Sequence, residues 1–236
     1  MPRWLMIAGL ASALAVCAPV RGQDSPTSAI SGGSATHGAQ ITFTYDHPQM
    51  APSHYVIVIN EDGHGHYQSA LNPDAPPDTQ NRLVTQPLDR DITVSRSTLD
   101  VLFSTARHHK LFDYPCENGA GKIAFRGNKE IAYRGPEGLG SCKFNWSKDE
   151  QIEKIGELLQ SMAFTLEEGG RLAIEYRHDR LALDAELDML VKAAKDDRAI
   201  ELQNISPQLQ EIAHDEQVLV RARQRAGQLL QGAAAK

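Results

Sequence analysis

Alternating apolar and polar residues predict β-strands in the first half of the chain. Residues 41–45 (ITFTY) alternate strictly, and residues 55–60 (YVIVIN) form a second run of strand length. Residues 61–63 (Glu-Asp-Gly) separate that run from residues 64–70 (HGHYQSA). An Asp-Gly pair between two strand-like runs favours a hairpin, because glycine readily adopts a positive φ. A further short strand is predicted at residues 91–94.

A helix with one apolar face is predicted after these strands. Within residues 99–106, apolar side chains recur at i, i+3, i+4 and i+7, the spacing of one helical face. Ser95 or Ser97 is suited to cap the N-terminus of this helix.

The same order of elements is predicted again further along the chain. Residues 122–125 and 130–133 read as strands joined by a turn at residues 127–128, and residues 142–146 read as a third strand. Hairpin, strand and helix then occur twice, which we interpret as a structural pseudo-repeat.

A second amphipathic helix follows that third strand. Ser147, with Glu150 three residues later, has the spacing of a capping box, and residues 152–162 carry the apolar stripe. We therefore expect an α+β fold, in which one antiparallel sheet carries two helices on one face and buries both apolar stripes.

Composition changes after Phe164. Residues 165–236 contain one aromatic residue and one proline, and apolar helical faces recur within residues 183–194 and 218–230. We predict that an α+β domain at residues 41–164 is followed by a short all-helical C-terminal segment.

Residues 1–22 have the organisation of a secretory signal peptide. A basic start precedes residues 4–20, which are uncharged and mostly apolar. Cleavage after Ala18 or after Gly22 fits the pattern, and we prefer Gly22 because the chain beyond it is polar. Residues 23–40 are rich in Ser, Gly, Ala and Thr without apolar periodicity, so we expect a flexible linker.

Residues 14–17 (Leu-Ala-Val-Cys) are similar to a lipoprotein processing box, although Val16 stands where a small residue is usual. We expect simple export to the periplasm or the extracellular space. Lipidation of Cys17, or an uncleaved signal segment, is the alternative that keeps the chain at a membrane.

Composition and charge narrow the class of partner. The chain has 236 residues, of which 41% are hydrophobic and 23% charged, as in ordinary globular proteins. Its net charge of −6 argues against nucleic acid, because binding to phosphates needs a basic surface. We expect the partner to be an envelope protein or ligand.

Cleavage of the signal peptide leaves two cysteines, Cys116 and Cys142. Two cysteines in an exported chain are most simply explained by a disulfide bond. The three glycines between residues 135 and 140 allow the chain to turn back so that the two cysteines meet.

His64 and His66 are candidate metal ligands. Alternate residues of a strand share a face, so both imidazoles can bind one transition metal, with a third ligand from Asp62 or from the pair His108 and His109. The alternative is a solvated hairpin tip beside a helix end, where histidine interacts favourably with the helix dipole. We expect no other cofactor.

Arg221 and Arg225 lie four residues apart and face the same side of a predicted helix. A phosphate site is one interpretation, and favourable charge at a helix C-terminus is the other. The His-Asp pair at residues 214–215 is interpreted as a break between two helices. Searches for a nucleophile elbow and for a phosphate-binding loop find neither motif in the sequence.

The hairpin sequence YVIVINEDGHGHYQSA and the helix sequence STLDVLFSTARHHKLFD resemble domains of unknown function in secreted bacterial proteins, over residues 41–163. The resemblance implies an exported α+β domain and transfers no catalytic residue. We expect an exported, non-catalytic domain that binds or interacts in the cell envelope. The alternative is a metal-binding protein or metal-dependent enzyme that uses His64 and His66.

Overall fold

The structure is a computed structural model that describes residues 38–71, 86–117 and 123–234. The predicted signal peptide at residues 1–22, the lipidation candidate Cys17 and all but the last three residues of the predicted linker lie outside these ranges.

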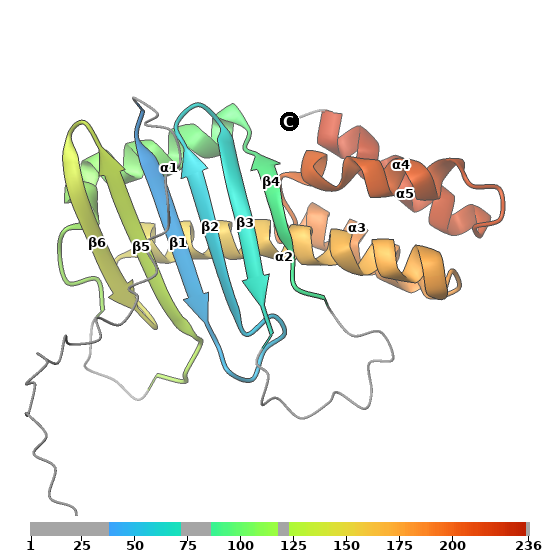
Figure 1. Ribbon diagram of the computed structural model, residues 1–236, viewed down its shortest axis with the longest axis horizontal. Coiled ribbons are helices and arrows are strands. Elements are labelled where there is room, and N and C mark those ends of the chain that lie inside the picture. The colour runs from blue at the N-terminus through green and yellow to red at the C-terminus, as the bar shows by residue number, and fades with distance from the viewer. Residues whose placement is uncertain (1–37, 72–85, 118–122, 235–236) are drawn as a thin grey trace, which may run out of the picture. The chain divides into compact units, whose positions relative to one another are not determined.

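Six antiparallel strands form one sheet in the order β4-β3-β2-β1-β5-β6 (Figure 1). Phe43 at the centre of the sheet is opposite Ile57 on one side and Ile131 on the other. The strands are β1 (Gln40–Asp46), β2 (His54–Asn60), β3 (His64–Ala70), β4 (Asp89–Thr93), β5 (Asn128–Gly135) and β6 (Gly138–Phe144).

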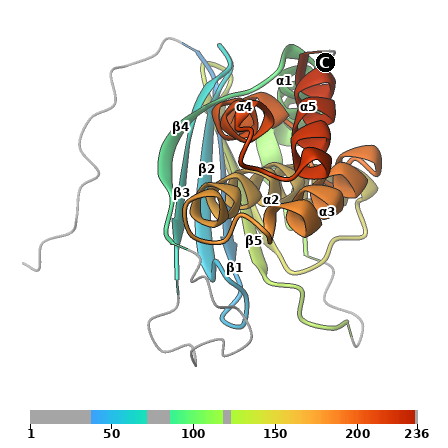
Figure 2. The same ribbon diagram turned by 90° about the vertical axis from the view of Figure 1, so that its right-hand side faces the viewer.

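The two helices α1 (Arg96–His108) and α2 (Glu150–His178) cover one face of this sheet (Figure 2). Their predicted apolar faces are buried against the inward-facing side chains of the strands. The buried residues include Leu99, Leu102, Phe103, Ala106, Ile152, Ile155, Leu159 and Met162. The predicted fold class, an antiparallel sheet with two helices on one face, is confirmed.

The second hairpin differs from the prediction. Residues 123–127 lie outside the sheet, and the hairpin is formed by β5 and β6 with Pro136 and Glu137 at the turn. Phe125 is 52% exposed and contacts the His47 ring, with centroids 5.1 Å apart, so the strand-like alternation there does not place it in the core of the sheet. The predicted pseudo-repeat is therefore wrong in detail, because the described residues between α1 and α2 form two strands, β5 and β6, and not three.

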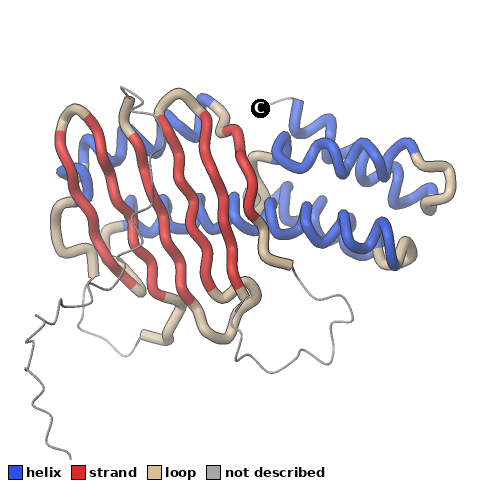
Figure 3. The backbone as a smooth tube through the Cα atoms, in the orientation of Figure 1, coloured by secondary structure: helices blue, strands red, loops and turns tan. Residues whose placement is uncertain are grey.

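The C-terminal segment is helical, as predicted, and lies beyond the β4 edge of the sheet (Figure 3). It contains α3 (Leu183–Lys195), α4 (Ser206–His214) and α5 (Val220–Ala234). Two short 3-10 turns, η1 (Lys110–Phe112) and η2 (Leu202–Ile205), complete the fold. The predicted break at residues 214–215 is confirmed, since α4 ends at His214.

The predicted boundary at residues 164–165 falls inside α2, which continues without interruption to His178. One hydrophobic core extends from Ala39 to Leu166, and a second begins at Leu172 and ends at Leu229. The change in composition therefore falls in the part of α2 where the helix leaves the first core and enters the second.

Asn204 of η2 joins the C-terminal segment to the edge of the sheet. Its side-chain oxygen accepts the Thr93 N–H at 2.8 Å, and its side-chain nitrogen donates to the Thr93 carbonyl oxygen at 2.9 Å. Arg90 donates to the Asn204 carbonyl oxygen at 2.5 Å. The side-chain amide of Asn204 therefore forms hydrogen bonds with the β4 backbone as a neighbouring strand would. These hydrogen bonds protect the edge of the sheet.

Two glycines of α2 provide a matched test of this packing. A Cβ at Gly169 would overlap Cγ2 of the fully buried Ile205, whereas a Cβ at Gly156 would lie 3.4 Å from its nearest neighbour, in Phe144. Alanine favours a helix over glycine by about 1 kcal/mol. We expect Gly156→Ala to raise the unfolding free energy by up to about 1 kcal/mol and Gly169→Ala to lower it by about 1–2 kcal/mol.

Urea unfolding followed by circular dichroism measures both values. Equal effects of the two substitutions would contradict the close approach of α2 and η2 at Gly169.

Candidate functional site

A cleft of about 1400 Å³ opens where α1 begins, beside the middle of α2 and the η2 turn. The ends of α3 and α5 complete its wall. Its lining includes Ser95, Thr98, Glu157, Leu158, Gln160, Ser161, Phe164, Ala194, Asp196, Asp197, Arg198, Ile200, Glu201, Gly232 and Ala233.

One face of α2 lines the cleft. Glu157, Gln160, Ser161 and Phe164 lie at i, i+3, i+4 and i+7, which places them in one row along about two turns of the helix. The small Ser161 lies at the centre of this row. The cleft therefore runs along a helix surface that no other described helix covers.

Half-buried apolar side chains form part of the lining. Leu158 and Ile200 pack against the first core, whereas Phe164, Ala194 and Ala233 pack against the second. The cleft thus lies at the junction of the two cores, where each contributes apolar surface to a shared hollow.

Glu201 holds the N-terminus of α1. Its carboxylate accepts the Ser95 N–H at 2.8 Å and the Ser95 hydroxyl at 2.6 Å, and it also accepts the Thr98 hydroxyl at 2.5 Å. The first N–H groups of a helix lack partners within the helix and carry partial positive charge, so a carboxylate stabilises them. Glu201 is only 7% exposed and has a φ of 55°.

One of the two residues predicted to cap α1 is at the cap position, but its side chain bonds differently from the prediction. Ser95 is the N-cap residue, but its side chain makes no capping bond to the helix and donates to Glu201 instead. Glu201 could not be found from the sequence around Ser95, because it lies 106 residues further along the chain and carries no local signal.

The charge of the cleft is predominantly negative. Four carboxylates line it, whereas one guanidinium, that of Arg198, does so, and its Nη2 lies 3.4 Å from Asp196. Helix α3, whose C-cap residue is Asp196, also ends at the cleft. Helix C-termini carry partial negative charge, so they add to the negative potential.

The predicted metal ligands do not converge. His64 and His66 share the sheet face opposite the helices, as predicted, while His108 belongs to α1 on the other face. The two ring nitrogens of His66 lie 3.0 Å from Asp89 and 2.9 Å from Asp91. Within residues 38–71, 86–117 and 123–234, no group of three or more His, Cys, Asp or Glu side chains is placed to hold a metal ion.

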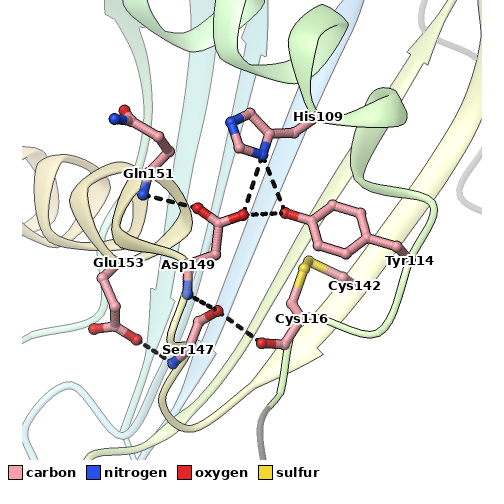
Figure 4. The surroundings of a disulfide bond; sticks show 8 residues. All are labelled: His109, Tyr114, Cys116, Cys142, Ser147, Asp149, Gln151 and Glu153. Atoms are coloured by element: carbon pink, nitrogen blue, oxygen red, sulfur yellow. Dashed lines mark hydrogen bonds and ion pairs between the residues drawn. A yellow bond between two sulfur atoms is a disulfide. The ribbon is translucent and has the colours of Figure 1, made fainter.

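The predicted disulfide between Cys116 and Cys142 is present, with Cα atoms 5.7 Å apart. Figure 4 shows its surroundings, where the Ser147 hydroxyl donates to the Cys116 carbonyl oxygen at 2.7 Å. The bridge ties the loop after α1 to strand β6, and Ser147 ties that loop to the start of α2.

The capping box predicted at Ser147 and Glu150 is wrong. Asp149 is the N-cap residue of α2 and accepts the Gln151 N–H at 3.0 Å, while Glu153 accepts the Ser147 N–H at 2.6 Å. The Ser147 hydroxyl oxygen accepts the Asp149 N–H at 3.1 Å and its proton is donated to the Cys116 carbonyl, so Ser147 stabilises the turn before the helix and the cap position falls to Asp149.

Asp149 also joins two aromatic rings near the disulfide (Figure 4). The Tyr114 hydroxyl donates to it at 2.9 Å, and the His109 Nδ1 lies 3.2 Å from it. Burial raises the pKa of the Asp149 carboxyl, but the hydrogen bonds from Tyr114 and Gln151 outweigh it and hold that pKa below its usual value. Burial and the Asp149 contact raise the pKa of Tyr114.

Arg221 and Arg225 are paired within the protein. Arg225 contacts both Asp184 and Asp188 of α3, and Arg221 lies 3.2 Å from Asp184. This pair thus joins α5 to α3, and the phosphate interpretation has no support in the contacts.

No protein-family model matches the chain, and no curated protein matches it. None of the helices in the described residues combines the length and the apolar character needed to cross a bilayer.

Proposed function

We propose that the chain is an exported, non-catalytic binding domain that holds an envelope protein or ligand in the cleft between α1, α2 and η2. The observation that carries this proposal is the cleft itself, about 1400 Å³ in volume, with both apolar and polar side chains in its lining. Ligand sites combine apolar walls with a few placed polar groups in this way.

The contacts of the polar groups give them a structural role at the cleft. The hydroxyls of Ser95 and Thr98 both donate to the Glu201 carboxylate, which also accepts the Ser95 N–H, so these groups hold the start of α1 and shape the wall of the cleft. Export is supported by the N-terminal pattern and by the disulfide, since disulfides persist in oxidising compartments.

Blocking the cleft tests the proposal. Ser161→Trp places an indole in the centre of the α2 row, whereas Ser104→Trp, on the exposed side of α1, is the matched control. The partner is first cross-linked to the mature protein in envelope extract and is then purified. We expect this partner to bind the control variant as tightly as it binds the unmodified protein. Its affinity for Ser161→Trp should fall at least about tenfold, or about 1.4 kcal/mol.

Calorimetric titration of the purified partner gives these affinities, and circular dichroism checks that both variants fold. A partner that binds Ser161→Trp as tightly as Ser104→Trp would reject the cleft as its site. The absence of any specific partner would reject the binding function.

A further inference from the structure

The dimensions, apolar side chains and charge of the cleft select a class of ligand. We propose that it binds a short amphipathic α-helix of a partner protein, with apolar side chains on one face and lysine or arginine beside them. This inference rests on the proposed binding function and specifies its partner.

The volume of the cleft fits a helix better than a small molecule. Small-molecule pockets usually enclose roughly 300–1,000 Å³, whereas this cleft encloses about 1400 Å³. A cylinder roughly 10 Å wide, the width of a helix with its side chains, would fill that volume over about 18 Å, or about three turns.

The wall along α2 has the form of a helix-packing surface. Its row from Glu157 to Phe164 presents the small Ser161 between larger side chains, and two small residues at the end of α5, Gly232 and Ala233, also line the cleft. Ridges of side chains on an added helix pack into grooves of this kind.

The apolar part of the cleft calls for apolar side chains on the ligand. Leu158, Phe164 and Ile200 are each only partly covered by the cores on which they pack. An added helix with apolar residues at i, i+3, i+4 and i+7 would cover all three, as in other helix-in-groove complexes.

The charge of the cleft calls for cations on the same ligand. Glu157, Asp196 and Asp197 outnumber the single Arg198, and the C-terminal end of α3 adds partial negative charge. The positive N-terminal end of α1 does not offset this charge, because Glu201 already neutralises it. The whole chain, with a net charge of −6, also attracts cationic partners.

The test uses a fluorescent peptide of about fourteen residues built from leucine and lysine in a helical pattern, with a leucine–glutamate peptide of the same pattern as the control. Fluorescence anisotropy measures their binding to the mature protein at near-physiological ionic strength. We expect the lysine peptide to bind and the glutamate peptide not to bind.

Two charge reversals separate the cleft from the general charge of the protein. Glu157→Lys changes a carboxylate in the cleft, and Glu216→Lys changes an exposed carboxylate outside it by the same amount. We expect Glu157→Lys to weaken binding of the lysine peptide at least about tenfold, and Glu216→Lys to change it less than about twofold. Ser161→Trp should abolish binding.

Each other outcome rejects a defined part of the inference. Equal effects of the two reversals, or no binding of the lysine peptide, would overturn the helix proposal even if Ser161→Trp still excluded the native partner. A native partner that ignores Ser161→Trp would instead overturn the binding function. A dimer of the protein that Ser161→Trp dissociates would assign the cleft to a second copy and overturn the proposal.

Discussion

Replacing Glu201 with alanine should lower the unfolding free energy by about 3 kcal/mol. The substitution removes a buried carboxylate that accepts hydrogen bonds from Ser95 and Thr98 at the start of α1 and from Gln203 within η2. Hydrogen bonds to a charged group are each worth more than neutral ones, and the donors left behind lose their partner. Urea unfolding of the mature protein measures the difference.

Two further variants separate the carboxylate from the backbone at this position. Glu201 has a φ of 55°, in the left-handed region where a side chain costs about 1–2 kcal/mol. Glycine avoids this cost, so Glu201→Gly should be more stable than Glu201→Ala by about 1 kcal/mol. Glu157→Gln, which changes an exposed carboxylate in the same cleft, should alter stability by less than about 0.5 kcal/mol. A Glu201→Ala protein as stable as Glu157→Gln would show that the carboxylate holds nothing in place.

The strands and the first hairpin could be predicted because their signals are local. Alternation in residues 41–45 places every second side chain in the core of β1, and Gly63 adopts the positive φ of 92° that the turn requires. Burial of one face and turn chemistry act over a few residues, so the sequence carries both directly.

The second hairpin could not be predicted, because which of two similar segments becomes a strand depends on pairing with strands that are distant in the sequence. Residues 122–125 alternate as well as residues 130–133 do, but only the latter pair with β1, where Ile131 lies opposite Phe43. On the other side, Ile131 is opposite Cys142, so the pairing that buries the strand also brings one cysteine into the core.

The candidate site was missed for the same reason. The cleft is lined by segments around residues 95, 160, 200 and 233, which meet only after the C-terminal segment packs beside β4. The histidine prediction was correct for the strand itself and could not extend to its neighbours. The shared face of His64 and His66 follows from strand geometry alone, but the carboxylates beside His66 come from β4, whose register the sequence does not reveal.

Stability should fall as the pH rises from about 5 to about 8, by roughly 2–4 kcal/mol. Burial raises the pKa of Glu168 and of Glu175 on α2 to about 7 from the usual 4.5. Glu186 lies near both residues and raises the two pKa values further, while Arg171 lowers them. Each of the two residues is 4% exposed, and each carboxyl has one oxygen without a hydrogen-bond partner.

The sign follows from the protons bound in each state. Between about pH 4.5 and pH 7 the folded protein holds protons on these two groups that the unfolded chain has already released. Their contribution to stability is therefore complete below the unfolded value of 4.5, declines as the pH rises through 7, and changes little above it. In most proteins the buried carboxyls are paired, and this trend has the opposite direction.

Glutamine at these positions removes the titration while keeping the shape of the side chain. We expect Glu168→Gln and Glu175→Gln each to unfold at higher urea concentration than the unmodified protein at pH 8 and at nearly the same concentration at pH 5, because the buried side chain then never acquires a charge. Glu216→Gln, at an exposed position, should leave the pH dependence unchanged. If the unmodified protein were as stable at pH 8 as at pH 5, or if both glutamine variants kept its full pH dependence, the two buried carboxyls would not be the groups that bind these protons.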